Sequence, residues 1–104
     1  MSARYISDSQ QRILKTVLVL FGHEIDGLAP GQVAKLVGTS ASNATRDLAN
    51  LIHIGIAERV PHNDNYRLAP MFGQKALAIL HSLDRAANRV EETRQRFTRN
   101  LNQP

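Results

Sequence analysis

Two helices joined by a tight turn are predicted by residues 30–48, whose sequence is PGQVAKLVGTSASNATRDL. Pro30 suits the first position of a helix, because its fixed backbone angle fits there and its missing N–H costs nothing. Gly38 is expected to end this helix, and Ser40 to cap the next one. The apolar side chains expected on the inner face of the first helix are Val33, Ala34 and Leu36.

The second helix of this motif, about residues 41–53, has an apolar and a polar face. Ala44, Leu48 and Leu51 recur at helical spacing and are expected to face a core, and Gly55 is expected to end the helix. The polar face consists of Asn43, Arg46 and Asn50, with Ser42 and Thr45 beside them.

A further helix is predicted upstream of this motif. Ser7 and Gln10 have the spacing of a capping box, and Gly22 follows where a left-handed residue can end the helix. Residues 23–27 are predicted to form a loop with Ile25 packed inward. The residues at helical spacing on the expected apolar face are Ile13, Leu14, Val17, Leu18 and Phe21.

Downstream, the periodicity changes from helix to strand. Residues 56–60 alternate in character, turn formers fill 61–65, and 66–68 suit a returning strand. From Pro70 a helix of roughly 30 residues is expected, because only Gly73 near its start disfavours one. The order helix, helix, tight turn, helix, hairpin is that of the winged helix-turn-helix. We therefore expect a mainly α fold with a small β-hairpin: a winged helix-turn-helix domain over 1–70 and a long C-terminal helix over 71–104.

Residues 27–38, which begin Gly-Leu and end in glycine, resemble the second helix of the IclR-type transcription regulators. Residues 40–48 resemble the recognition helix of that family, although Ser40 or Ala41 stands where the family has proline. Gly55 and the run Tyr66-Arg67-Leu68 lie where the family has a glycine and its closing strand. The resemblance implies sequence-specific DNA binding. It does not extend to the family's large effector-binding domain, for which 104 residues leave no room, so no small-molecule effector is expected.

Arg46 is the leading candidate for a DNA contact, to a guanine edge or a phosphate. The alternative is a solvated arginine paired with Asp47 or Glu58. A wing over about 57–68 is expected on the DNA backbone or in the minor groove. Ser40 is favoured as a helix cap over a base contact. Gly31 and Gln32, at the start of the first helix of the motif, could touch phosphate through backbone N–H groups. The full set of expected DNA contacts is Gln32, Ser40, Ser42, Asn43, Thr45, Arg46, Asn50, Arg59 and Arg67.

The C-terminal helix carries apolar residues at alternating steps of four and three, which indicates a coiled-coil seam and a homodimer. The expected dimerisation residues are Ile79, Leu83, Ala86, Val90 and Phe97, with Leu101 continuing the pattern. The alternative is a helix folded back along residues 8–21. Two copies related by a two-fold axis would contact a palindromic site with half-sites one helical turn apart.

Composition narrows the function further. A net charge of +4 and a pI of about 10.1 favour an anionic partner, most commonly nucleic acid. The chain has no cysteine, so disulfides, thiol catalysis and cysteine zinc sites are excluded. Its four histidines lack zinc spacing, and we find no nucleophile motif or Gly-rich phosphate loop. We expect a protein that is not an enzyme and needs no cofactor or metal.

These observations together predict a homodimeric, double-stranded DNA-binding transcription regulator, acting most simply as a repressor. No apolar run suits a membrane span and the first residues lack a secretory signal, so a cytoplasmic location is expected. Two alternatives stay open: a winged-helix protein–protein interaction module, and an accessory factor of a mobile-element or replication complex. RNA binding is disfavoured, because few aromatic residues remain for base stacking.

Overall fold

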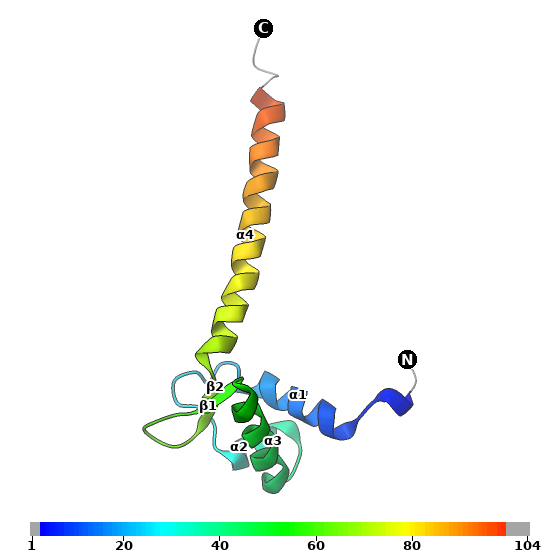
Figure 1. Ribbon diagram of the computed structural model, residues 1–104, viewed down its shortest axis with the longest axis vertical. Helices are drawn as coiled ribbons and strands as arrows, with labels where there is room; N and C mark the ends of the chain where they lie inside the picture. Colours follow the sequence, from blue (N-terminus) through cyan, green and yellow to red (C-terminus); the bar gives the residue numbers. More distant parts are fainter. Residues whose placement is uncertain (1–2, 100–104) are drawn as a thin grey trace. The chain divides into compact units, whose positions relative to one another are not determined.

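The computed structural model describes residues 3–99 and divides the chain into two compact units, Met1–Phe72 and Gly73–Pro104. We call the first the winged unit. Its hairpin and three helices, with the long helix that follows, confirm the predicted mainly α fold (Figure 1). Leu101, expected in the dimer seam, lies outside the described residues. The elements are the 3-10 turn η1 (Ala3–Tyr5), α1 (Asp8–Leu20), α2 (Pro30–Val37), α3 (Ala41–Ile54), β1 (Ala57–Arg59), β2 (Tyr66–Leu68) and α4 (Pro70–Arg99).

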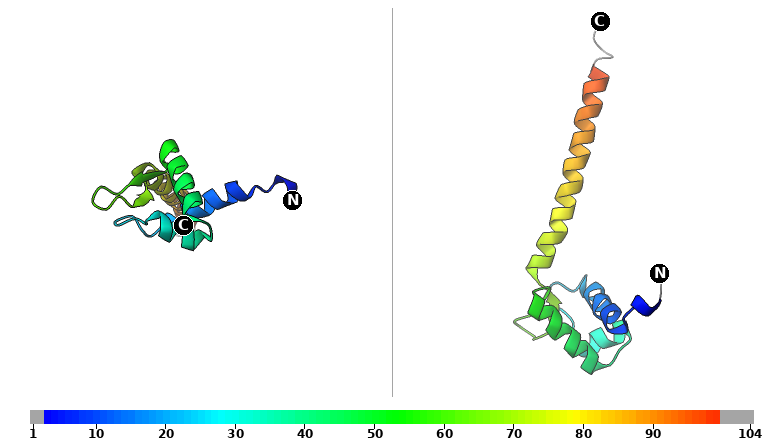
Figure 2. Two further views of the ribbon diagram at one scale, coloured as in Figure 1. Left: turned by 90° about the horizontal axis from the view of Figure 1, so that it is seen from below. Right: turned by 45° about the vertical axis from the view of Figure 1, so that its right-hand side comes forward.

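The core of the winged unit lies where α1, α2 and α3 meet, and β1 and β2 close it on the side of the hairpin. Figure 2 shows these three helices gathered together, with the hairpin loop projecting from them. The predicted inner residues of α3, which are Ala44, Leu48 and Leu51, are all buried. Removing such side chains from water is the main force that holds α3 in place. Among the described residues, Thr16, Leu20, Val33 and Val60 have no exposed surface, like Ala44 and Leu48.

The predicted apolar face of α1 is only half correct. Its buried side runs through Thr16 and Leu20, while Leu14 is exposed and Leu18 is 67 % exposed. The predicted positions span a stripe wider than the surface that α2 and α3 cover, so one edge of the stripe stays in solvent. Phe21, at the end of this edge, is also exposed.

Two further apolar residues were predicted inside and lie outside. Leu36 is 58 % exposed, because Val33 and Ala34 face the core and Val37, one turn after Val33, packs beside them. Ile25 is 76 % exposed, so its expected inward packing is also wrong.

Most helix ends follow the predicted capping. The Ser40 Oγ accepts a hydrogen bond from the Asn43 N–H at 3.1 Å, which satisfies a free donor at the start of α3. The Ser7 Oγ accepts one from the Gln10 N–H at 3.4 Å. Within residues 3–99 the Gln10 side chain makes no return bond, so the predicted capping box at α1 is only half formed.

The hairpin is tied to the chain ahead of α2. β1 and β2 pair antiparallel, with Ala57 opposite Leu68. Leu28 and Tyr66 exchange two backbone N–H···O bonds of 2.8 and 2.9 Å. These bonds form an isolated antiparallel β-bridge between the hairpin and the chain ahead of α2. Gly27 permits this approach, because its φ is +67° and an added Cβ would lie 2.6 Å from the Tyr66 carbonyl oxygen.

α4 is one continuous helix of 30 residues, as predicted, with no buried residue in a single chain. At 1.5 Å per residue it is about 45 Å long. No helix in the described part of the chain combines the length and the apolar character needed to cross a membrane.

Candidate nucleic-acid interface

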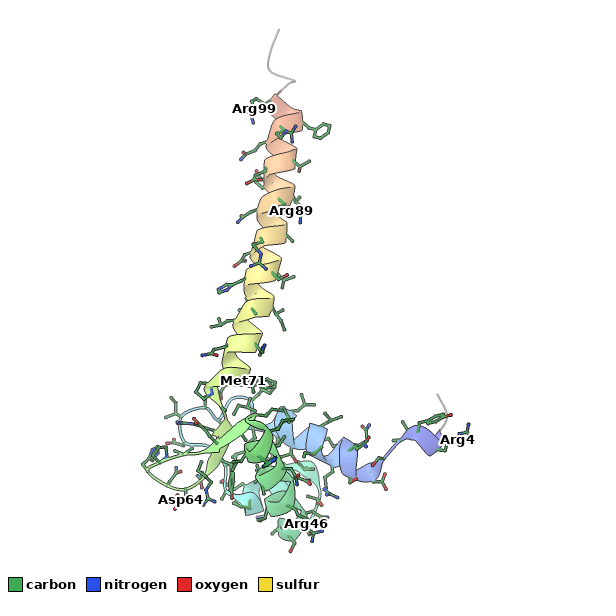
Figure 3. All side chains as sticks on the ribbon, in the orientation of Figure 1. Arg4, Arg46, Asp64, Met71, Arg89 and Arg99 are labelled. Carbon is green, nitrogen blue, oxygen red and sulfur yellow. The ribbon has the colours of Figure 1, made fainter. Side chains whose placement is uncertain are left out.

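The outer face of α3 is exposed and polar, with small residues between its polar groups. A shallow surface hollow there is lined by Ala41, Ser42, Thr45, Arg46 and Ala49. Arg46 lies on the surface of the winged unit (Figure 3). The small side chains leave the helix backbone open to close approach by a large ligand, and Arg46 supplies a positive charge at the same place.

Arg46 has no ion-pair or side-chain hydrogen-bond partner among residues 3–99. The two carboxylates that could neutralise it are bonded to other arginines. Asp47 is buried and accepts bonds from Arg12 Nε at 2.6 Å and Nη2 at 3.0 Å. Glu58 accepts a bond of 2.9 Å from Arg67 Nε. The charge of Arg46 is therefore available to a ligand, and its predicted alternative role as a surface ion pair is not what the structure contains.

Arg12 and Asp47 join α1 to α3 through a two-bonded, charge-assisted pair. The hydrogen bond to Asp47 raises the pKa of Arg12, with a smaller contribution from the charge of the carboxylate, while partial burial opposes both. The guanidinium is thus charged at every pH at which proteins are normally handled. The signal for this pair could not be found in the sequence, since the partners lie 35 residues apart.

The two asparagines predicted on the α3 surface are partly engaged within the protein. The Asn43 Nδ2 donates to the Thr39 Oγ1 at 3.0 Å, and the Asn50 Nδ2 donates to the Arg46 carbonyl oxygen at 2.9 Å. Each amide oxygen is left to accept a bond from a ligand. Each Nδ2 also carries a second N–H, so an asparagine can offer a donor and an acceptor to an adenine edge while it keeps its internal bond.

Gln32 caps α2, and the backbone N–H through which it is expected to approach phosphate is engaged within the helix. That N–H donates to the Ala29 carbonyl oxygen at 3.0 Å. The Gln32 Oε1 accepts a bond of 2.9 Å from the Ala29 N–H. Both groups serve the first turn of α2, which leaves the side-chain Nε2 of Gln32 as its remaining donor.

The arginines of the wing are held against the protein. Arg67 lies opposite Glu58 in the hairpin, bonds to it, and has a second, longer contact of 3.4 Å to the Glu24 carbonyl oxygen. Arg59 donates to the Tyr66 hydroxyl at 2.9 Å, and its guanidinium carbon lies 4.6 Å from the centre of that ring. Arg59 is exposed and keeps donors free, whereas the charge of Arg67 is compensated.

The loop of the wing is fastened to the α1–α2 loop through Asp26. The Asp26 carbonyl oxygen accepts bonds from Asn63 Nδ2 at 2.9 Å and Asn65 Nδ2 at 3.1 Å. His62 Nε2 lies 3.4 Å from an Asp26 carboxylate oxygen. Asp64, with a positive φ of 59°, adds a second acid to this end of the hairpin, which Figure 3 marks. Two carboxylates make the wing tip a poor surface for phosphate.

Basic charge is distributed unevenly between the two units. Residues 1–72 carry seven Lys or Arg and six Asp or Glu, for a net charge of +1. Residues 73–104 carry six Lys or Arg and three Asp or Glu, for a net charge of +3. Affinity for DNA rises with the number of phosphates neutralised, so one winged unit offers little nonspecific attraction.

Among residues 3–99, no three His, Asp or Glu side chains are grouped so that they could hold a metal ion. No protein-family model matches the chain, and no curated protein matches it either. The resemblance of roughly residues 8–70 to the IclR-type regulators therefore stays a prediction.

Proposed function

We propose that the protein is a sequence-specific, double-stranded DNA-binding transcription regulator that acts as a homodimer and inserts α3 in the major groove. The observation that carries this proposal is the exposed, unpaired Arg46 on a polar face of α3, with Asp47 and Glu58 bonded to other arginines. In a winged helix-turn-helix, this helix is the one that enters the groove.

The proposed contacts differ in role. Arg46 donates two bonds to a guanine edge, while Ser42 and Thr45 contact phosphate or a neighbouring base. Asn43 and Asn50 accept bonds through their free amide oxygens. Ser40 holds the start of α3 and does not contact bases. Of the wing residues, we keep Arg59 as a backbone contact and assign Arg67 to the hairpin itself.

A homodimer is part of the proposal because one winged unit offers few contacts to DNA. With a net charge of +1 over residues 1–72 and one polar helix face, a single winged unit contacts few phosphates and few base pairs. Two copies on a palindrome, with half-site centres about 34–36 Å apart, double the interface. Occupation of a promoter by such a dimer represses transcription without any further domain.

The test is selection of bound duplexes from a random DNA library at one fixed salt concentration. The wild-type chain should enrich a palindrome. Arg46→Ala should weaken binding to it by about 1–3 kcal/mol, roughly 5- to 150-fold, and relax the preference at one base pair of each half-site. Arg4→Ala removes an exposed arginine outside α3 and is the matched control, which should keep the motif. Binding without an enriched motif, equal in all three proteins, would contradict the proposal.

A second candidate is a winged-helix protein-interaction module, including an accessory factor of a replication or mobile-element complex. The observation that favours it is the exposed apolar edge of α1, formed by Leu14, Leu18 and Phe21. This candidate predicts no selected duplex. It also predicts that a substitution on α1 abolishes binding of the partner protein, and that a substitution at Arg46 does not.

A further inference from the structure

A polar hollow of about 250 Å³ lies between α1 and the turn that joins α2 to α3. Its wall on the α1 side consists of Asp8, Gln11, Arg12 and Lys15, and Thr39 lies on the side of the turn. None of the DNA contacts expected from the sequence lines it. The hollow is therefore a separate polar surface, with two cations and one carboxylate around it.

The hollow borders the polar face of α3 at two points. The Thr39 Oγ1 accepts a hydrogen bond from the Asn43 Nδ2 at 3.0 Å. Arg12 bonds to Asp47, which lies one helical turn after Asn43 on α3. Arg46, the exposed arginine of α3, directly precedes Asp47. The hollow thus lies immediately beside the face of α3 that is proposed to enter the major groove.

A helix in the major groove has a sugar–phosphate backbone close to it on each side. The groove of B-DNA is about 12 Å wide, and an α-helix with its side chains is about 10–12 Å across. Groups directly beside α3 therefore meet phosphates when α3 lies in the groove. On the α1 side of α3, those groups are the ones that line the hollow.

The hollow has hydrogen-bond donors available for such a phosphate. Lys15 is exposed and forms no ion pair in the described part of the chain. Arg12 bonds to Asp47 through Nε and Nη2, so its Nη1 keeps two N–H groups for another acceptor. The Thr39 hydroxyl accepts a bond from α3 and can still donate its own hydrogen. Three side chains from two segments can thus bind one anion.

We propose that the hollow binds one backbone phosphate of the DNA on the α1 side of α3, with Lys15 as its main positive charge. This inference rests on the DNA binding proposed above and adds a phosphate site to it. Such a contact fixes the position of the protein on the duplex and carries no base preference of its own. Asp8 weakens the site, because its carboxylate lines the same hollow and repels a phosphate.

Titration of the full chain at several salt concentrations tests the site, with the selected palindrome and an unrelated duplex as probes. Lys15→Gln removes one charge from an exposed side chain. The slope of log K against log salt becomes shallower by about 0.9 for each phosphate no longer neutralised, or about 1.8 for a dimer. Binding to both duplexes should weaken by the same factor. Asp8→Asn should strengthen binding to both.

Lys35→Gln is the matched control. It makes the same change at an exposed residue of α2 that does not line the hollow, and it should keep the wild-type slope. A wild-type slope with Lys15→Gln, an equal loss of slope with Lys35→Gln, or weaker binding with Asp8→Asn would each overturn the inference.

Neutral methylphosphonate groups locate the contact on the DNA. When they replace the phosphates of the palindrome one at a time, wild-type binding should weaken at one position of each half-site where Lys15→Gln loses nothing further, because an interaction cannot be lost twice. Equal losses in the two proteins at every position overturn the inference. A wild-type chain that selects no motif removes the proposed DNA binding and this site with it. A selected motif that Lys15→Gln binds with the wild-type slope removes the phosphate site alone.

Discussion

Arg12 on α1 holds Asp47 on α3 through two hydrogen bonds of 2.6 and 3.0 Å, directly beside the outward-facing Arg46. Residues 46 and 47 thus have opposite roles on one turn of helix. Asp47 fixes α3 to α1 from the inside, and Arg46 is left free on the outside. Rigid support of this kind fixes the direction in which a contact residue points.

Replacing Asp47 by alanine should destabilise the winged unit. The substitution leaves the Arg12 guanidinium without its acceptor and a gap between α1 and α3, at a cost of about 1–3 kcal/mol for the lost buried carboxylate. Urea unfolding measures the loss. The double variant Arg12→Ala with Asp47→Ala should cost clearly less than the two single losses added, since the pair acts as a unit. Additive losses would mean that the two residues do not stabilise each other.

Arg67 and Arg46 should respond to alanine substitution in opposite ways. Arg67→Ala removes the cross-strand partner of Glu58, so the melting temperature should fall while affinity for a selected duplex changes by no more than about twofold. Arg46→Ala should leave the melting temperature within about 2 °C and weaken duplex binding, because an exposed residue without partners contributes little stability. Thermal melts and duplex titrations on the two proteins check this. A large affinity loss with Arg67→Ala would place the wing on DNA.

Gly27→Ala should destabilise the hairpin strongly. The added Cβ would lie 2.6 Å from the Tyr66 carbonyl oxygen and 2.8 Å from Val60 Cγ2, at a backbone φ that alanine disfavours. We expect a cost of more than about 1 kcal/mol, measured by urea unfolding. Gly31→Ala is the control, because nothing lies within 4 Å of a Cβ at that position. Equal stability of the two variants would contradict the close approach of Leu28 and Tyr66.

The polar and apolar faces of α3 and the length of α4 could be predicted because they follow local rules. Ser40 bonds three residues ahead, and the buried Ala44 and Leu48 are one helical turn apart. The face of α1 could not be predicted in the same way. The predicted apolar face of α1 includes Val17, next to the buried Thr16, and also Leu18, which is exposed. The sequence pattern allows either edge of this face to be buried, and only the packing of α2 and α3 determines which edge it is.

The sequence by itself determined the order of the elements, the ends of α2 and α3, and the residues on each face of α3. Periodicity and capping depend on groups a few residues apart, and those groups are adjacent in the chain. Tertiary structure alone decided which charges are free. Arg46, Arg59 and Arg67 are the same type of residue in the sequence. In the structure, Arg59 bonds to Tyr66 and Arg67 bonds to Glu58. Asp47, the neighbour of Arg46, bonds instead to Arg12, which lies 35 residues away in the chain. Ion pairing depends on distance in space, which packing sets and local sequence does not.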